Sequence, residues 1–154
     1  MDVNGEINYV TSSTTRRVHN DTSNTIKTSG AIYFDAAWAN VDTTYYKVDL
    51  PTAGTYLIYG TFRALHDGDV VCFAKVRLYN NTDAAVVTNS DRMLIEIRYG
   101  AGHGLVNMMC SSLWQIAVTA AKTIYLQGYA TAANTAGIQC DSNGYDEFGY
   151  VRLF

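Results

Sequence analysis

The chain has 154 residues, a length that fits a single domain. Hydrophobic residues make up 48% of the sequence and charged residues only 16%, with a formal net charge of −3. This balance argues against a nucleic-acid-binding protein, because Lys and Arg supply most of the affinity for phosphates. No apolar run reaches the roughly 18 residues that a membrane-spanning helix needs. Because charged residues are few, much of the surface must consist of Thr, Ser, Asn, Gly and Ala. A neutral surface of this kind favours contacts with other proteins.

Residues 1–28 predict a polar N-terminal arm, followed by one folded domain over residues 29–154. The arm is rich in Thr, Ser, Asn and Asp, and it contains the only basic dipeptide, Arg16-Arg17. It shows no helical period. A segment of this composition cannot bury enough apolar surface to fold alone. We therefore expect the arm to be extended, or ordered only against a partner.

The pattern from residue 29 onward predicts an all-β domain of about eight strands. Pro51, the only proline, cannot donate to a strand ladder and is expected to end the second strand. The segment 66–69 (His-Asp-Gly-Asp) predicts a hairpin turn, segment 80–83 a second turn, and segment 131–147 a polar loop. Only 112–121 could form a helix, and its β-branched residues argue against one. The expected strands cover 30–34, 45–50, 55–65, 70–79, 84–88, 93–99, 105–118, 122–130 and 148–154.

Cysteine and tyrosine usage narrows the class of protein. The three cysteines (Cys72, Cys110 and Cys140) are odd in number and far apart, so at least one thiol is free and no disulfide framework is expected. The polar, acidic start of the chain does not resemble a secretory signal. We therefore expect synthesis in a reducing compartment. The 12 tyrosines suit strands and protein interfaces alike.

Two short motifs resemble those of a known family. Residues 51–59 (Pro-Thr-Ala-Gly-Thr-Tyr-Leu-Ile-Tyr) resemble the Pro-x-x-Gly-x-Tyr-x-Phe stretch of TNF- and C1q-like domains, and residues 148–154 resemble their last strand. Residues 123–127 correspond to their penultimate strand. The Gly-Asp that usually precedes that strand is replaced by Ala120-Ala121-Lys122. Over roughly residues 29–154, the resemblance implies a two-sheet jelly roll that assembles as a homotrimer with aromatic residues along the threefold axis.

Alternation along the last strand predicts two faces. We assign one of them to the trimer contact, although alternation alone leaves open which face packs on the core. The other face carries Gly149, Val151 and Leu153. The face assigned to the trimer contact carries Phe148, Tyr150, Arg152 and Phe154.

The sequence carries no pattern typical of a metal site or a cofactor site. His19, His66 and His103 lie in separate segments, and neither a His-x-x-x-His nor a Cys-x-x-Cys spacing occurs. Segment 67–69 offers two carboxylates but lacks the rest of a calcium loop. The glycine-rich segment 100–104 lacks the Lys-Ser/Thr of a phosphate loop. We therefore expect no cofactor.

No catalytic constellation is predicted either. Ser111-Ser112 lies within a strand and outside any Gly-x-Ser-x-Gly elbow. Asp146 and Glu147 are adjacent, so on a strand they point to opposite faces and cannot act together on one sugar. We therefore expect a protein without enzymatic activity.

The jelly-roll resemblance suggests a virion protein, because this architecture is widespread in tailed-phage decoration proteins and fibre tips. The leading hypothesis is a trimeric decoration protein outside a phage capsid, made in the host cytoplasm, whose partners are itself and the major capsid protein or another virion protein. Arg16, Arg17 and His19 of the arm are the predicted capsid contacts, ordered on binding. No nucleic acid or membrane partner is expected.

Two alternatives are open at this stage. The first is a receptor-binding fibre tip that recognises a host glycan or surface protein through loops 36–46 and 131–147. In that case Trp38 and Tyr145 would stack on sugar rings. The second is a soluble ligand of the TNF and C1q kind.

Overall fold

The computed structural model describes residues 18–19, 30–68, 70–98, 106–140 and 146–153. These residues form strands joined by turns, which confirms the predicted all-β class. Within these ranges no helix is long and apolar enough to cross a membrane. The strands are β1 Val18–His19, β2 Gly30–Tyr33, β3 Ala39–Asn40, β4 Lys47–Leu50, β5 Gly54–His66, β6 Cys72–Asn80, β7 Ala85–Val86, β8 Arg92–Ile97, β9 Val106–Val118, β10 Lys122–Ala130, β11 Ala136–Cys140 and β12 Glu147–Arg152.

Six strands form the first antiparallel sheet, called sheet A, around the long strand β5. One edge of β5 pairs with β9 along its whole length, from Gly54 opposite Val118 to His66 opposite Val106. The other edge pairs first with β12 and then with β11. β12 pairs onward with β1, and β11 pairs onward with β2. Val18 and His19 of the predicted arm are thus part of sheet A, and the rest of residues 1–28 lies outside the described residues.

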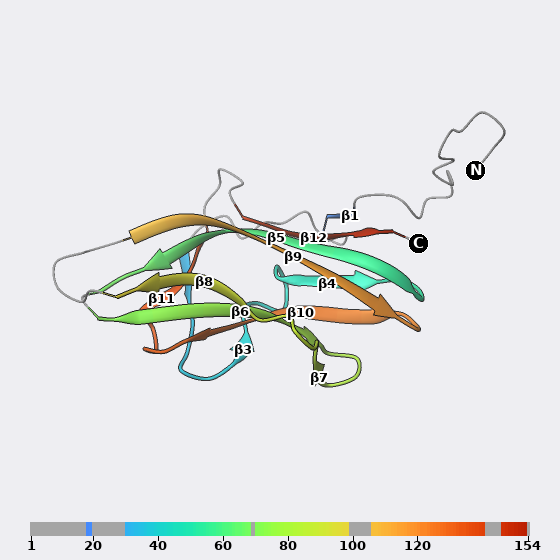
Figure 1. The fold of residues 1–154 in the computed structure, drawn as a ribbon, viewed down its shortest axis with the longest axis horizontal. Helices are drawn as coiled ribbons and strands as arrows, with labels where there is room; N and C mark the ends of the chain where they lie inside the picture. The colour runs from blue at the N-terminus through green and yellow to red at the C-terminus, as the bar shows by residue number, and fades with distance from the viewer. Residues whose placement is uncertain (1–17, 20–29, 69, 99–105, 141–145, 154) are drawn as a thin grey trace, which may run out of the picture.

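The other six strands form the second antiparallel sheet, called sheet B. β10 pairs with β6 on one edge and with β4 and β3 on the other. The far edge of β6 pairs with β7 and β8. Figure 1 shows the two sheets as two layers, with β5, β9 and β12 in one and β6, β10 and β3 in the other. The structure therefore confirms the jelly-roll sandwich.

The core lies between the two sheets and follows from the period of two along each strand. In β5 the side chains of Tyr56, Ile58 and Phe62 point inward and are fully buried. In β10, Ile124 and Leu126 meet them from sheet B. Burial of each such side chain contributes about 1.5–3 kcal/mol relative to exposure. All three cysteines are free thiols, and two of them, Cys72 and Cys140, are buried in this core.

The predicted hairpin at residues 66–69 is wrong. His66 ends β5 in sheet A and Cys72 begins β6 in sheet B, so the chain passes from one sheet to the other. Both edges of β5 are already paired, which leaves no edge for β6. Gly68 has φ +122°, a conformation that favours glycine. The turn at 80–83 is confirmed, because β6 and β7 pair across it.

The predicted polar loop at 131–147 contains a strand. β11 runs from Ala136 to Cys140 and lies between β5 and β2. Ala136, Ile138 and Cys140 are buried. A Cβ at Gly137 would lie 1.9 Å from the carbonyl oxygen of Ile32, so this position requires glycine. The small side chains of the strand hid its apolar alternation among polar neighbours.

Candidate interaction surfaces

The outward side of sheet A carries a row of large apolar side chains, here called the apolar face. Because Tyr56 and Ile58 point into the core, the alternate residues Leu57 and Tyr59 of β5 point outward. Tyr59 lies opposite Leu113 of β9 on one side and Gly149 of β12 on the other. Alternation places further members on the same side. The apolar face consists of Leu57, Tyr59, Met109, Leu113, Val151 and Leu153.

Three members of the apolar face are well exposed. The exposed fractions are 55% for Leu113, 53% for Met109 and 39% for Leu153. Leu57, Tyr59 and Val151 are half-buried and lie between Leu113 and Leu153, whereas Ser111 separates Met109 from Leu113. Exposed apolar side chains gathered on one face mark an interaction site in many soluble proteins.

Glycine at position 149 allows the apolar face to be smooth. A Cβ there would lie 2.5 Å from the hydroxyl oxygen of Tyr59 and 2.8 Å from the ring carbon that bears it. The Tyr59 side chain therefore lies across β12 at Gly149, and any other residue at position 149 would displace the Tyr59 ring. The Phe-Gly-Tyr sequence of the last strand thus has a packing reason on this side of the sheet.

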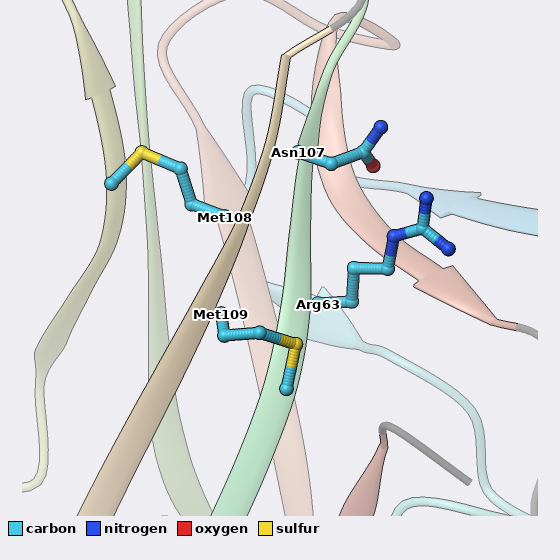
Figure 2. A pocket seen from close by; sticks show the side chains of 4 residues that line it. All are labelled: Arg63, Asn107, Met108 and Met109. Atoms are coloured by element: carbon cyan, nitrogen blue, oxygen red, sulfur yellow. The ribbon is translucent and has the colours of Figure 1, made fainter. Parts of the chain in front are cut away.

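One end of the apolar face is hollowed. Arg63 of β5 and Asn107, Met108 and Met109 of β9 line a shallow depression of about 170 Å³. Figure 2 shows Met109 and Asn107 on the same side of β9 as Arg63, whereas Met108 extends in the other direction. The flexible thioether side chain of Met109, beside the Arg63 guanidinium, can adapt to a side chain of a partner.

Among the described strands, β9 pairs only with β5, so its other edge is open. The 13 residues of β9 include no charged residue. Three side-chain hydrogen bonds tie it to the segment around β8: Trp114 Nε1 donates to Ser90 O at 2.6 Å, Cys110 Sγ to Leu94 O at 2.8 Å, and Arg92 Nη2 to Leu113 O at 3.4 Å. β9 thereby keeps a fixed position, with the Arg92 guanidinium beside it.

The outward side of sheet B differs in chemistry and is here called the aromatic–cation face. The Arg77 guanidinium lies over the Trp38 ring, 4.1 Å from its centroid, and the Lys75 ammonium lies 5.1 Å from the Phe73 centroid. Tyr129 packs beside both rings, 5.4 Å from Trp38 and 6.2 Å from Phe73. The face consists of Trp38, Phe73, Lys75, Arg77, Gln127 and Tyr129.

A small polar cluster lies buried between the sheets. The Tyr46 hydroxyl lies 3.5 Å from Cys140 Sγ, and the backbone N–H of Arg63 donates to the buried Asp146 carboxylate at 2.8 Å. Burial raises the pKa of Tyr46 well above its usual value, and the negative charge of Asp146 raises it further. This cluster has a structural role in joining β5 to the segment before β12.

The structure corrects the predicted trimer contact. Phe148 and Tyr150 are each only 5% exposed and belong to the core, where they pack against the Phe62 and Tyr56 rings. Arg152 points the same way and donates from Nη2 to the Ala53 carbonyl at 2.9 Å. Phe154 lies outside the described residues. The face that looked like an aromatic contact is therefore the inner face, and the outer face carries the alternate residues of β12.

The other predicted contacts are only partly within the described residues. Arg16, Arg17 and Tyr145 lie outside them, and for His19 only the backbone is described, opposite Gly149. Trp38 lies just before β3 and packs on Arg77 and Tyr129. The structure thus brings Trp38 together with residues that sequence reasoning did not single out.

The residues considered for metal binding or catalysis are placed apart. His66 is buried at the end of β5, with Nε2 3.1 Å from the Val70 carbonyl oxygen. Asp146 is buried and Glu147 is half-buried, as expected of neighbours on opposite faces. Over the described part of the chain, no three His, Cys, Asp or Glu side chains are grouped closely enough to hold a metal ion.

Comparison with known proteins gives distant structural likenesses. No protein-family model and no curated protein matches the chain. A pentameric capsid protein from metagenomic phage sequences shares 9% identity at a TM-score of 0.33, over 80% of this chain and 62% of that one. A chain of the IBDV viral particle shares 11% identity at a TM-score of 0.42, over 82% and 34%.

A third likeness is a carbohydrate-binding module from Cellvibrio mixtus lichenase 5A, solved with cellotriose. It shares 12% identity at a TM-score of 0.39, over 92% of this chain and 99% of that module. The present chain spans less than two thirds of the length of the two viral chains. Likenesses this distant do not define a function.

Proposed function

We propose that this chain is a non-enzymatic structural protein of a virion, a trimeric decoration protein on the outside of a phage capsid. The observation that carries the proposal is the apolar face, with Leu113 and Met109 more than half exposed in the single chain. Covering such side chains with a second surface stabilises the complex by about 25 cal/mol for each Å² of apolar surface removed from water. Copies of the chain are the proposed cover, and the trimer axis lies on the sheet A side.

Composition and topology support self-association through this side. The 13 residues of β9 carry no charge of their own, and the Arg92 guanidinium lies beside the strand at the Leu113 carbonyl oxygen. On the sheet B side the aromatic rings pack on one another, although Met93 of β8 is also 51% exposed there. Free thiols at Cys72, Cys110 and Cys140 agree with synthesis in a reducing cytoplasm.

Attachment to the capsid rests on the N-terminal arm. Val18 and His19 of the arm form β1, which pairs with β12 at the edge of sheet A. In the proposal Arg16, Arg17 and His19 contact the capsid, and three arms in one trimer multiply modest individual affinities.

The assembly is tested by light scattering of the full chain over a range of concentrations. We expect a trimer for the wild type and a monomer for the Met109→Glu/Leu113→Glu double variant, because two buried charges oppose association. Met93→Glu is the matched control, since Met93 is 51% exposed but lies on β8 of sheet B. A wild type that stays monomeric throughout contradicts the proposal.

The location is tested by adding the protein to particles and to host cells. Decoration requires wild-type protein to bind capsids and a chain lacking residues 2–24 to lose that binding. A fibre tip, the second candidate, instead requires adsorption of the isolated protein to host cells. The observation that favours this second candidate is the packing of the half-buried Trp38 beside other aromatic rings.

A further inference from the structure

The aromatic–cation face holds two cations whose charges are not neutralised. Three other cations on or next to sheet B lie beside carboxylates: Lys47 lies 3.3 Å from Asp49, Arg98 3.0 Å from Glu96, and Lys122 next to Asp83. Among the described residues, neither Lys75 nor Arg77 has a carboxylate partner. Both lie instead over aromatic rings. We propose that this face binds a saccharide that carries a carboxylate, such as a uronic or sialic acid.

Arg77 is held in place as a receptor for an anion. Its Nε donates to Gln127 Oε1 at 2.9 Å, and Gln127 Nε2 donates to Asn40 Oδ1 at 3.2 Å. The Trp38 ring supports the flat side of the guanidinium. These contacts fix the side chain before any ligand arrives and leave the two terminal amino groups to donate. A fixed guanidinium with both terminal groups available binds a carboxylate through two parallel hydrogen bonds.

Lys75 adds a second positive charge on the same side of the sheet. It lies two residues from Arg77 on β6, so both side chains point outward from neighbouring positions of one face. Two cations are too few for a nucleic acid, whose binding depends on neutralising many phosphates. They suit a ligand with one carboxylate, or one carboxylate per sugar unit.

The aromatic residues supply the part of the site that a sugar ring needs. Trp38, Tyr129 and Phe73 form a row whose neighbouring centroids are 5.4 and 6.2 Å apart, and all three side chains are half-buried. Their exposed edges and faces offer apolar surface to the C–H groups of a sugar. An acidic peptide would use the cations but has no ring to lay on this row, so the saccharide is the better match.

The site is independent of the proposed assembly. All of its residues come from one chain and lie on sheet B, on the opposite side of the sandwich from the apolar face. A chain that fails to form trimers keeps the site, so the two proposals fail separately.

The test is a titration of the full chain, followed by the two indole N–H signals in NMR spectra. Sialyllactose and trigalacturonate are the acidic probes, and lactose and methyl-esterified trigalacturonate are the neutral ones. An acidic probe should shift the Trp38 signal. The Trp114 signal should stay, because that indole is buried and bonded to Ser90 O. Equal binding of the neutral probes, or binding of hexaglutamate as tight as either acid, overturns the proposal.

Variants assign the effect to the two cations. Arg77→Gln should weaken binding of the acidic probe by about tenfold or more, because a charge-assisted pair of hydrogen bonds is lost. Lys75→Gln should weaken it several-fold and serves as the second variant if Arg77→Gln disturbs the packing of Trp38. Arg98→Gln is the control, since Arg98 directly follows β8 of the same sheet but is paired with Glu96. Unchanged affinity in both Arg77→Gln and Lys75→Gln overturns the assignment.

Discussion

The two outer faces of the sandwich differ in how their large side chains are packed. On sheet B the aromatic rings pack on one another, and cations lie over their faces. On sheet A, Leu113 and Met109 extend outward with more than half of their surface exposed. A face whose side chains contact one another is stable in water, whereas a face of separate apolar side chains becomes stable when covered. Under the proposed function, this difference is the reason for placing the contact between copies on sheet A.

The largest expected effect comes from the layer that separates the two faces. Phe148→Ala should lower the free energy of unfolding by about 3–5 kcal/mol, because it leaves a cavity beside Phe62. Val151→Ala, on the outer side of the same strand, should cost less than about 1 kcal/mol. Urea unfolding measures both. Equal losses in the two variants would mean that β12 is buried on both sides, and the comparison between faces would break.

The two tryptophans sharpen the comparison at the next level. Trp114→Phe should cost about 1–3 kcal/mol, because it leaves the buried Ser90 carbonyl without its donor. Trp38→Phe on the aromatic–cation face should cost under about 1 kcal/mol, since a phenyl ring still supports Arg77. Thermal and urea unfolding should rank the two variants in this order. The reverse order would show that sheet B depends on its outer layer for stability.

Alkaline pH probes the buried cluster between the faces. The folded state keeps Tyr46 protonated where the unfolded chain ionises it, since burial and then Asp146 raise its pKa. The contribution of protonated Tyr46 to the free energy of unfolding is therefore complete below about pH 10, the usual tyrosine pKa. It is lost as the pH rises further. Relative to wild type, Tyr46→Phe should flatten the decline above pH 10 by up to about 1.4 kcal/mol per pH unit. Parallel declines in urea unfolding would place Tyr46 in contact with water.

The smallest expected effect is the coupling within the aromatic–cation face. A double-mutant cycle of Trp38→Leu and Arg77→Met should give a coupling free energy of about 0.5–1 kcal/mol. The pair is half-buried and stacked at 4.1 Å, which is close enough to couple. Additive losses of unfolding free energy would mean that the guanidinium is held by Gln127 alone.

Strand positions followed from the sequence wherever apolar residues alternate over several positions. β5 and β10 were predicted to within a residue or two, because Tyr, Ile, Leu and Phe recur at every second position. β11 was missed, because its buried positions are Ala136, Ile138 and Cys140, and small residues give a weak signal. The hairpin at 66–69 was wrong, because turn residues predict where a chain bends and carry no information on which edge the next strand joins.

The apolar face was only partly within reach of sequence reasoning. In β12 both faces are apolar, so alternation defined two sets without choosing between them, and the aromatic set proved to be the inner one. In β9 the uncharged run is typical of a strand buried on both sides. Exposure of Met109 and Leu113 follows from the position of β9 in sheet A, which depends on pairings with residues 40 to 64 positions away. The Arg77–Trp38 contact joins separate strands in the same way.

The position of β12 has a consequence for how the chain folds during synthesis. This strand lies between β1 and β5, yet its residues 147–152 leave the ribosome about ninety residues after the β5 partners Tyr56–Thr61. Sheet A therefore cannot close until residues 147–152 have emerged, and such long-range pairing makes folding slow. Until then one long edge of β5 has no partner, so nascent chains of this protein are exposed to mispairing with one another.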